Sequence, residues 1–253
     1  IISNLAFAED CSWKWVNPLP QGNDLNTVDF LNNDIVFITG DYGTLMKSTD
    51  AGISWIIIKT ETNDIFKPYF FDENQILLID NNDNIFLSFN GGKNWSEKIQ
   101  LTQNLNNGRF HFFDMNNGFY YSQIDSIMLK TTNCGDSWDT IKIPPTNYYR
   151  NLMYFFNQNI FFIVDKSSLI KTTNGGINWS IYSNNLPDST LKTLFFVNEN
   201  IGWISGSKGK IYKTTDGGLT WQKQNVCKNT EEVKYYKFFD ENTGYIFSGN
   251  ISG

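Results

Sequence analysis

Lys213-Thr214-Thr215-Asp216-Gly217-Gly218-Leu219-Thr220-Trp221 is the clearest copy of a unit that the chain repeats. It contains the frame Ser/Thr-x-Asp/Asn-x-Gly-x-x-Trp. The five copies have at the fixed positions Ser48, Asp50, Gly52, Trp55; Ser88, Asn90, Gly92, Trp95; Thr131, Asn133, Gly135, Trp138; Thr172, Asn174, Gly176, Trp179; and Thr214, Asp216, Gly218, Trp221. An Asp or Asn side chain accepts N–H bonds across a tight turn, glycine allows positive φ, and tryptophan is a large apolar anchor. Each copy therefore predicts a hairpin turn with an anchor.

The tryptophans of the repeat recur with a nearly constant spacing. Counted from Trp15, the intervals are 40, 40, 43, 41 and 42 residues. This period is that of a four-stranded propeller blade. The frame is then the turn between the third and fourth strands of a blade.

The sequence between the frames repeats as well. In the first unit we expect strands at 28–31, 35–38 and 44–47, with an Asx-rich turn at 32–34 between the first two. The corresponding first strands of the other units carry paired aromatics, at 69–71, 110–113, 154–156, 194–196 and 237–239. Paired aromatics predict that each first strand is covered on both faces, as an innermost blade strand would be.

The two ends of the chain complement each other. Two strands near 236–239 and 244–248 have no frame after them, whereas residues 8–15 resemble a degenerate sixth frame. Joining the ends predicts an all-β, six-bladed β-propeller of four-stranded antiparallel blades over 1–253, with the last blade shared between 1–18 and 235–253 and no open sheet edge. A truncated seven-bladed parent is the alternative. Ala6-Phe7-Ala8 could instead end a signal peptide.

Composition narrows the class of protein. A net charge of -6 argues against a nucleic-acid partner, and no apolar run is long enough for a membrane span. Cys11, Cys134 and Cys227 do not have the spacing of a zinc site, and Cys11 with Cys227 could form one bridge across the ring closure. We expect neither a metal nor a cofactor.

The frame is the Asp-box, and the chain resembles Asp-box (BNR-like) β-propellers: sialidases, sortilin-type receptors and photosystem II assembly-factor-like proteins. A sialidase holds its substrate carboxylate with three arginines, and this chain has only Arg109 and Arg150. Assembly members use a basic patch that two arginines hardly reproduce. The opening 15–25 and the Asn, Ile, Lys and Phe content resemble exported Bacteroidota-type proteins, which implies a secreted or cell-surface bacterial location.

Five cations precede the aromatic pairs of successive units, and aromatic side chains lie near one of them. The candidate ligand-binding residues are Lys67, Arg109, Arg150, Lys192, Lys234, Tyr148 and Tyr149. By the strand order, the cations lie where each chain enters its inner strand, on the rim of the central channel. Such a ring could bind a carboxylate, a sulfate or an acidic peptide; solvated strand starts are the alternative.

The loop carboxylates, the Asp and Asn residues of the frames and the histidine are weaker candidates for a functional site than the cations. The carboxylates Asp41, Asp80, Asp83, Asp125 and Asp165 lie in expected second-to-third-strand loops on one rim. They are candidates for a glycosidase pair or, alternatively, turn residues. Three of the five frames carry Asn, which argues for a structural role and against calcium or acid–base chemistry there. The only histidine, His111, lies within an aromatic strand and is expected to be packed.

These observations predict a non-enzymatic binding or scaffold propeller with the channel rim as the contact face for a protein or glycan partner. It could also be a component of a larger surface assembly. A glycoside hydrolase using rim carboxylates and a photosystem-type assembly factor are the alternatives.

Overall fold

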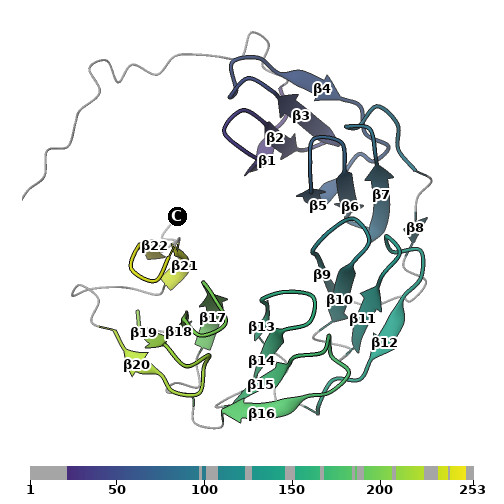
Figure 1. Ribbon diagram of the computed structural model, residues 1–253. Coiled ribbons are helices and arrows are strands. Elements are labelled where there is room, and N and C mark those ends of the chain that lie inside the picture. Colours follow the sequence, from purple (N-terminus) through teal and green to yellow (C-terminus); the bar gives the residue numbers. More distant parts are fainter. Residues whose placement is uncertain are drawn as a thin grey trace, which may run out of the picture. The chain divides into compact units, whose positions relative to one another are not determined.

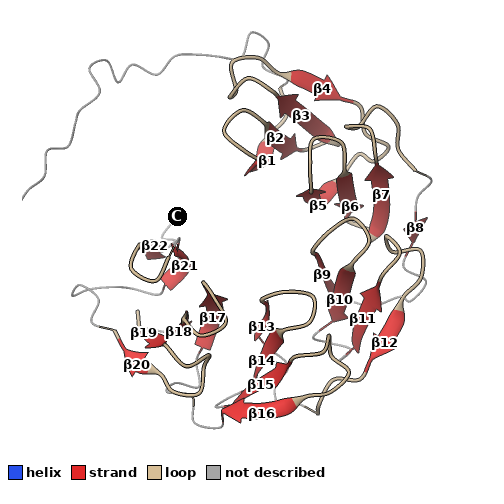
Figure 2. Cartoon of the chain, viewed as in Figure 1, coloured by secondary structure: helices blue, strands red, loops and turns tan. Residues whose placement is uncertain are grey.

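The computed structural model describes residues 22–96, 99–100, 108–122, 127–145, 152–165, 168–183, 186, 191–206, 209–224, 233–238 and 240–248. The chain divides into two compact units, 1–102 and 103–253. Every regular element in the described residues is a strand (Figure 2). The predicted all-β class is therefore confirmed. No described helix is long and apolar enough to cross a membrane.

The first unit contains two four-stranded antiparallel sheets, in which neighbouring strands follow each other along the chain (Figure 1). Sheet A consists of β1 (Leu25–Phe30), β2 (Val36–Gly40), β3 (Thr44–Ser48) and β4 (Ile56–Ile58). Sheet B consists of β5 (Ile65–Phe70), β6 (Ile76–Asp80), β7 (Asn84–Ser88) and β8 (Ile99–Gln100). This up-and-down order is the one expected for propeller blades.

The second unit contains three further sheets of the same kind and one hairpin. Sheet C consists of β9 (Gly108–Phe112), β10 (Gly118–Ser122), β11 (Ile127–Thr131) and β12 (Asp139–Ile141). Sheet D consists of β13 (Leu152–Phe155), β14 (Phe161–Asp165), β15 (Ser168–Thr172) and β16 (Ser180–Ser183). Sheet E consists of β17 (Leu191–Phe196), β18 (Gly202–Gly206), β19 (Ile211–Thr214) and β20 (Gln222–Lys223), and hairpin F consists of β21 (Val233–Phe238) and β22 (Gly244–Ser248). The predicted first strands all lie in or overlap these elements.

In every sheet, and in hairpin F, the first two strands are joined by the same side-chain-capped turn. In sheet A, Asn32 Oδ1 accepts the N–H groups of Asp34 at 2.9 Å and Ile35 at 2.8 Å. The same pair of bonds is formed by Asp72, Asp114, Asn157, Asn198 and Asp240. A short polar side chain that can bond the backbone two and three residues ahead fixes the turn, and hence the strand register.

All five frames form turns with one shared set of hydrogen bonds. In the first frame, Ser48 Oγ donates to Asp50 Oδ1 at 2.8 Å and accepts the N–H of Gly52 at 2.8 Å, while Asp50 Oδ1 accepts the N–H of Ser54. The same three bonds recur in the other four frames, whether the second position is Asp or Asn. The frame glycine has φ between 84° and 102° in every copy. The frame thus closes the turn between the third and fourth strands of each complete sheet.

Acid should weaken the turns that carry Asp. Burial raises the pKa of Asp216, but hydrogen bonds from the hydroxyl and N–H of Thr220 and from Thr214 outweigh it and hold the pKa below its usual value. A carboxylate with a depressed folded-state pKa contributes stability above its unfolded pKa of about 3.9, and that contribution is lost as pH falls further. We expect Asp216→Asn to reduce the loss of unfolding free energy below about pH 4, measured by urea titration between pH 7 and pH 3.

The Asn frames provide a matched control for this prediction. Asn174 makes the same backbone bond as Asp216 without a titrating group, since its Oδ1 accepts the N–H of Asn178 at 2.9 Å. Asn174→Asp should therefore add acid sensitivity where Asp216→Asn removes it. Equal acid profiles for the parent and Asp216→Asn would contradict the prediction.

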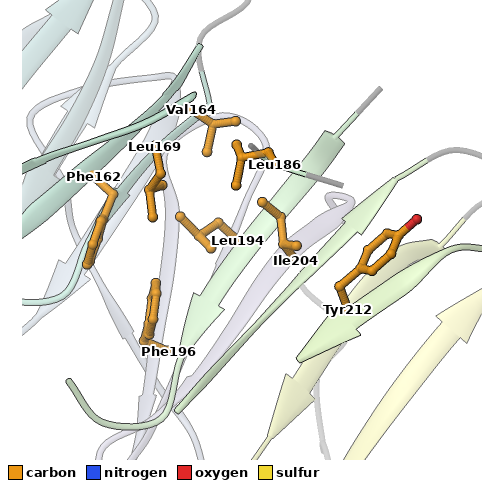
Figure 3. Close-up of a cluster of buried hydrophobic side chains, with 8 residues drawn as sticks. All are labelled: Phe162, Val164, Leu169, Leu186, Leu194, Phe196, Ile204 and Tyr212. Atoms are coloured by element: carbon orange, nitrogen blue, oxygen red, sulfur yellow. The ribbon is translucent and has the colours of Figure 1, made fainter. Parts of the chain in front are cut away.

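The sheets of each unit pack face to face on apolar side chains. Sheets A and B share a core that includes Phe37, Leu45, Ile76 and Leu78, all buried. Sheets C and D meet around Phe119, Met128 and Phe161, and hairpin F meets sheet E through the stacked rings of Phe238 and Trp203, 3.7 Å apart. Figure 3 shows the cluster between sheets D and E, formed by Phe162, Val164, Leu169, Leu186, Leu194, Phe196, Ile204 and Tyr212.

One expectation about the first strands is wrong for β1. Val28 and Phe30 are 56% and 69% exposed, although both were predicted to be covered. Sheet A contacts sheet B through the face that carries Phe37 and Leu45. Val28 and Phe30 lie on the opposite face, because they pair with Ile38 and Val36, the two neighbours of Phe37 on β2, and successive side chains of a strand alternate between the faces. Among the described residues of the first compact unit, sheet A has a neighbouring sheet on one face only.

Lysines on the third strands link consecutive sheets. Lys47 Nζ donates to the carbonyl of Glu73 at 3.0 Å, and Lys213 Nζ donates to the carbonyl of Glu241 at 2.9 Å. Each ammonium group also lies over an aromatic ring, with Nζ of Lys47 5.5 Å from the Phe37 ring centre and Nζ of Lys213 5.1 Å from the Trp203 ring centre. The amphipathic side chain thus covers apolar surface and satisfies a turn carbonyl at once.

Several predictions fall outside the described residues. These are the degenerate frame at 8–15, the third and fourth strands expected for the last blade within 1–18, and the pairing of Cys11 with Cys227. Cys134 is a free thiol. A single six-bladed propeller over 1–253, with its last blade shared between the chain ends, stays a prediction.

Candidate functional site

The first unit contains a pocket of about 680 Å³. The loop between β4 and β5, the turn between β6 and β7, and the side chains that follow on β7 and its frame turn all contribute to it. Its principal lining residues are Glu61, Asp64, Asp80, Asn84, Phe86 and Trp95. We call it the acidic pocket, because three carboxylates and two aromatic rings are among its lining residues.

The turn between β6 and β7 positions the buried polar part of this pocket. Asp80 Oδ1 accepts the N–H groups of Asn82 at 2.8 Å and Asn84 at 2.9 Å, and Asp80 Oδ2 accepts Asn84 Nδ2 at 2.7 Å. Asp80 and Asn84 are only 6% and 3% exposed. Asn84 Oδ1 is buried without a hydrogen-bond partner in the described chain. The turn therefore leaves one acceptor unsatisfied in the pocket lining.

The aromatic side of the acidic pocket is held by contacts between sheets A and B. Trp95 packs against the core that Phe86 and Ile58 share, and its Nε1 donates to the carbonyl of Lys59 at 2.9 Å. In the frames of Trp55, Trp138 and Trp221, the indole instead donates to the carbonyl of its own frame glycine. The different bond of Trp95 ties its ring to the chain that enters the β4–β5 loop.

The loop between β4 and β5 supplies the two exposed carboxylates, Glu61 and Asp64. Thr62 Oγ1 accepts the N–H of Asp64 at 3.2 Å and donates to its carbonyl, which makes a local turn. Thr60 Oγ1 donates to the carbonyl of Gly43 at 2.8 Å, fixing the loop to sheet A. Of the polar lining residues, only Asp80 was a candidate from the sequence; Glu61, Asp64 and Asn84 were not predicted, although the polar run 60–64 could have indicated the first two.

The predicted cationic ring is described at two of its positions. Lys67 lies on β5, with Nζ 5.0 Å from the Tyr69 ring centre, and exposed Arg109 lies on β9, where it hydrogen-bonds Tyr121. They belong to different units. The predicted residues Arg150, Tyr148 and Tyr149, and the side chains of Lys192 and Lys234, lie outside the described part. The ring stays a prediction.

The rim carboxylates are observed mainly as turn residues. Asp41, Asp80, Asp83 and Asp165 lie at or beside second-to-third-strand turns, as predicted, and Asp125 is outside the described residues. Asp41 Oδ1 accepts Asn26 Nδ2 at 2.8 Å. Burial, together with the charge of Asp80, raises the pKa of Asp83. Asp80 and Asp83 belong to one tight turn, so they do not face each other across a cleft as a glycosidase pair must.

His111 is packed among aromatic rings, as expected. Its ring stacks on Phe155 at 4.6 Å and lies edge-on to Phe113 at 4.7 Å. These contacts join sheets C and D. His111 is thus part of an aromatic cluster between two sheets.

The repeated four-stranded sheets and their turns place the chain in the class of BNR-like β-propellers. The chain belongs to the family described as photosynthesis system II assembly factor YCF48, whose model matches residues 56–186, just over half of the chain. A search of curated proteins found no match.

Solved structures share the fold at low sequence identity. YCF48 from Cyanidioschyzon merolae is 17% identical over 92% of this chain and 95% of that one, with a TM-score of 0.50. A structure described as YCF48 bound to D1 peptide is 16% identical over 93% and 95%, with a TM-score of 0.48. An ancestral GH74 enzyme is 19% identical over 90% of this chain but only 34% of its own, with a TM-score of 0.57.

The family corrects two expectations from the sequence. The predicted location, secreted or on the surface of a bacterial cell, is wrong, because the family is one of photosystem II assembly factors. The assembly-factor hypothesis, ranked below a general binding role because of the two arginines, is as well supported as that role.

Proposed function

We propose that the chain is a non-enzymatic binding module that holds a polypeptide during the assembly of photosystem II. The observation that carries the proposal is the family match, which extends from β4 in sheet A to Leu186 beyond sheet D. An assembly factor has to bind its partner and release it, and it needs no catalytic group. The proposed contact face carries the second-to-third-strand turns, and one of these, between β6 and β7, lines the acidic pocket.

The chemistry of the acidic pocket supports binding over hydrolysis. A glycosidase needs one carboxyl group free to give a proton and a second one facing it. Asp80 uses both of its oxygens to hold the β6–β7 turn. Glu61 and Asp64 come from the same six-residue loop, 59–64, and both are exposed. The likeness to GH74 enzymes extends to the fold alone.

The proposal is tested by capture from photosynthetic membranes. The tagged chain is incubated with solubilised membranes, and its co-migration with photosystem II polypeptides is measured on native gels and by mass spectrometry. We expect co-migration with incompletely assembled complexes, displaced by an excess of untagged chain. A BNR propeller of another family serves as the control for non-specific capture.

Two results would overturn this function. One is the absence of any displaceable co-migration with photosystem II polypeptides. The other is turnover of a polysaccharide such as xyloglucan that is abolished by Glu61→Gln or Asp64→Asn, because it would make the acidic pocket an active site.

A further inference from the structure

The acidic pocket has an excess of hydrogen-bond acceptors. Glu61, Asp64 and Asp80 line it, and none of its described lining residues is Lys, Arg or His. Carboxylates gathered in a concave site attract cations, because low-dielectric walls concentrate their field. A ligand for this pocket should therefore carry positive charge and several N–H donors.

Asn84 provides an independent sign that a donor is missing. Its Nδ2 donates to Asp80 Oδ2 at 2.7 Å, and this bond fixes the amide orientation, because the flipped amide would place two acceptors against each other. Asn84 Oδ1 is then left buried without a partner in the described chain. A buried acceptor without a donor is costly, and native proteins rarely keep one. A bound donor group would remove that cost.

The aromatic lining selects among cations. Phe86 and Trp95 form apolar parts of the pocket, and the Trp95 ring is held by its bond to the Lys59 carbonyl. A guanidinium stacks on aromatic faces and binds carboxylates with two parallel N–H bonds. A hard metal ion would instead seek a shell of six or more oxygens at short distances. The combination of rings and carboxylates fits an organic cation.

We propose that the acidic pocket binds an arginine side chain presented by the partner polypeptide. The source of that arginine rests on the function proposed above, whereas the chemistry of the pocket does not. The guanidinium pairs with Glu61 and Asp64 at the mouth, lies against Trp95, and directs N–H groups towards the Asp80 and Asn84 end of the pocket. The corresponding acceptor in sheet A has its donor within the chain. Thr44 begins β3 as Asn84 begins β7, and the Thr44 hydroxyl accepts Asn23 Nδ2 at 2.9 Å.

The test uses short peptides and the full chain. A peptide with a central arginine flanked by Gly and Ser is titrated, and binding is followed by the Trp95 indole N–H resonance, assigned by its loss in Trp95→Phe. The reference peptide carries citrulline, which has the same shape without the charge. We expect saturable shifts with arginine only, weakening with salt because exposed charges are screened.

The variants test whether peptide binding depends on the carboxylates of the acidic pocket or only on the overall negative charge of the chain. Glu61→Gln with Asp64→Asn removes two exposed charges at the mouth and leaves the β6–β7 turn intact, so folding should be retained. We expect about tenfold weaker binding, as two partly exposed ion pairs would provide. The matched control is Asp34→Asn with Glu73→Gln, which removes the same charge from the same unit away from the pocket; it should bind as the parent does.

Three outcomes would overturn the arginine site. They are equal binding of the citrulline peptide, equal weakening in the control variant, and a Trp95 shift with a neutral oligosaccharide but none with the arginine peptide. If the arginine peptide does not bind but photosystem II polypeptides are still captured, the arginine site is wrong and the proposed function is retained. If the arginine peptide binds but no photosystem II polypeptide is captured, the arginine site is retained and its proposed partner is wrong.

Discussion

Replacing Phe161 with alanine is expected to lower the unfolding free energy by about 3–5 kcal/mol, the usual cost of removing a buried aromatic ring. Phe161 on β14 is fully buried, and its ring lies within 5.2 Å of the ring centres of Phe119, Phe155 and Trp179. These rings come from both sheets C and D, so the cavity would open between two sheets. Urea unfolding followed by tryptophan fluorescence measures the loss.

Ile177 in the same sheet is the control for Phe161. It lies in the frame turn after β15 and is 79% exposed, so Ile177→Ala should change the unfolding free energy by less than about 0.5 kcal/mol. A loss below about 1 kcal/mol for Phe161→Ala at an unchanged denaturant slope would show that sheets C and D do not share this core.

Replacing Gly92 with alanine should cost about 2–5 kcal/mol, the sum of backbone strain and overpacking. Gly92 has a φ of +84°, which costs an L-residue about 1–2 kcal/mol. An added Cβ would also lie 2.4 Å from Ile58 Cγ2 on the neighbouring sheet A, and overpacking of this kind costs about 1–3 kcal/mol. Thermal and urea unfolding of the variant measure the sum.

Gly52 separates the two causes, because its φ of +85° is nearly the same while its added Cβ would meet nothing closer than Trp55 Cζ2 at 3.5 Å. Gly52→Ala should therefore cost about 1–2 kcal/mol, from strain alone. If both variants lose the same free energy, the contact of the added Cβ with Ile58 is relieved at no cost, and the larger loss expected for Gly92→Ala is wrong.

The sequence predicted the parts of the fold that depend on local chemistry. Each frame specifies its turn through a hydroxyl, an Asx oxygen and a glycine that lie within five residues of one another, so no distant contact is needed. The Asx turns at Asn32 and its counterparts are equally local. The regular spacing of these turn sequences along the chain then predicted the four-stranded sheets.

The sequence could not predict features that arise where separate segments meet. The acidic pocket combines Glu61 and Asp64 with Asp80 and Asn84, which lie about twenty residues away, and the pairing of β5 with β6, in which Ile65 is opposite Asp80, brings the two segments together. The Trp95 indole departs from the usual frame bond for the same reason, since its acceptor, the Lys59 carbonyl, belongs to the segment after sheet A. The exposure of β1 also depends on which neighbour a sheet has.

The lysine links between sheets have a consequence for how such a repeat can diverge. Lys47 and Lys213 reach main-chain carbonyls, at Glu73 and Glu241, and every residue type supplies that acceptor. Mutation of either glutamate leaves the oxygen in place. Duplicated modules could thus drift in the sequence of these turns, and acquire new surfaces there, without losing the attachment of one module to the next.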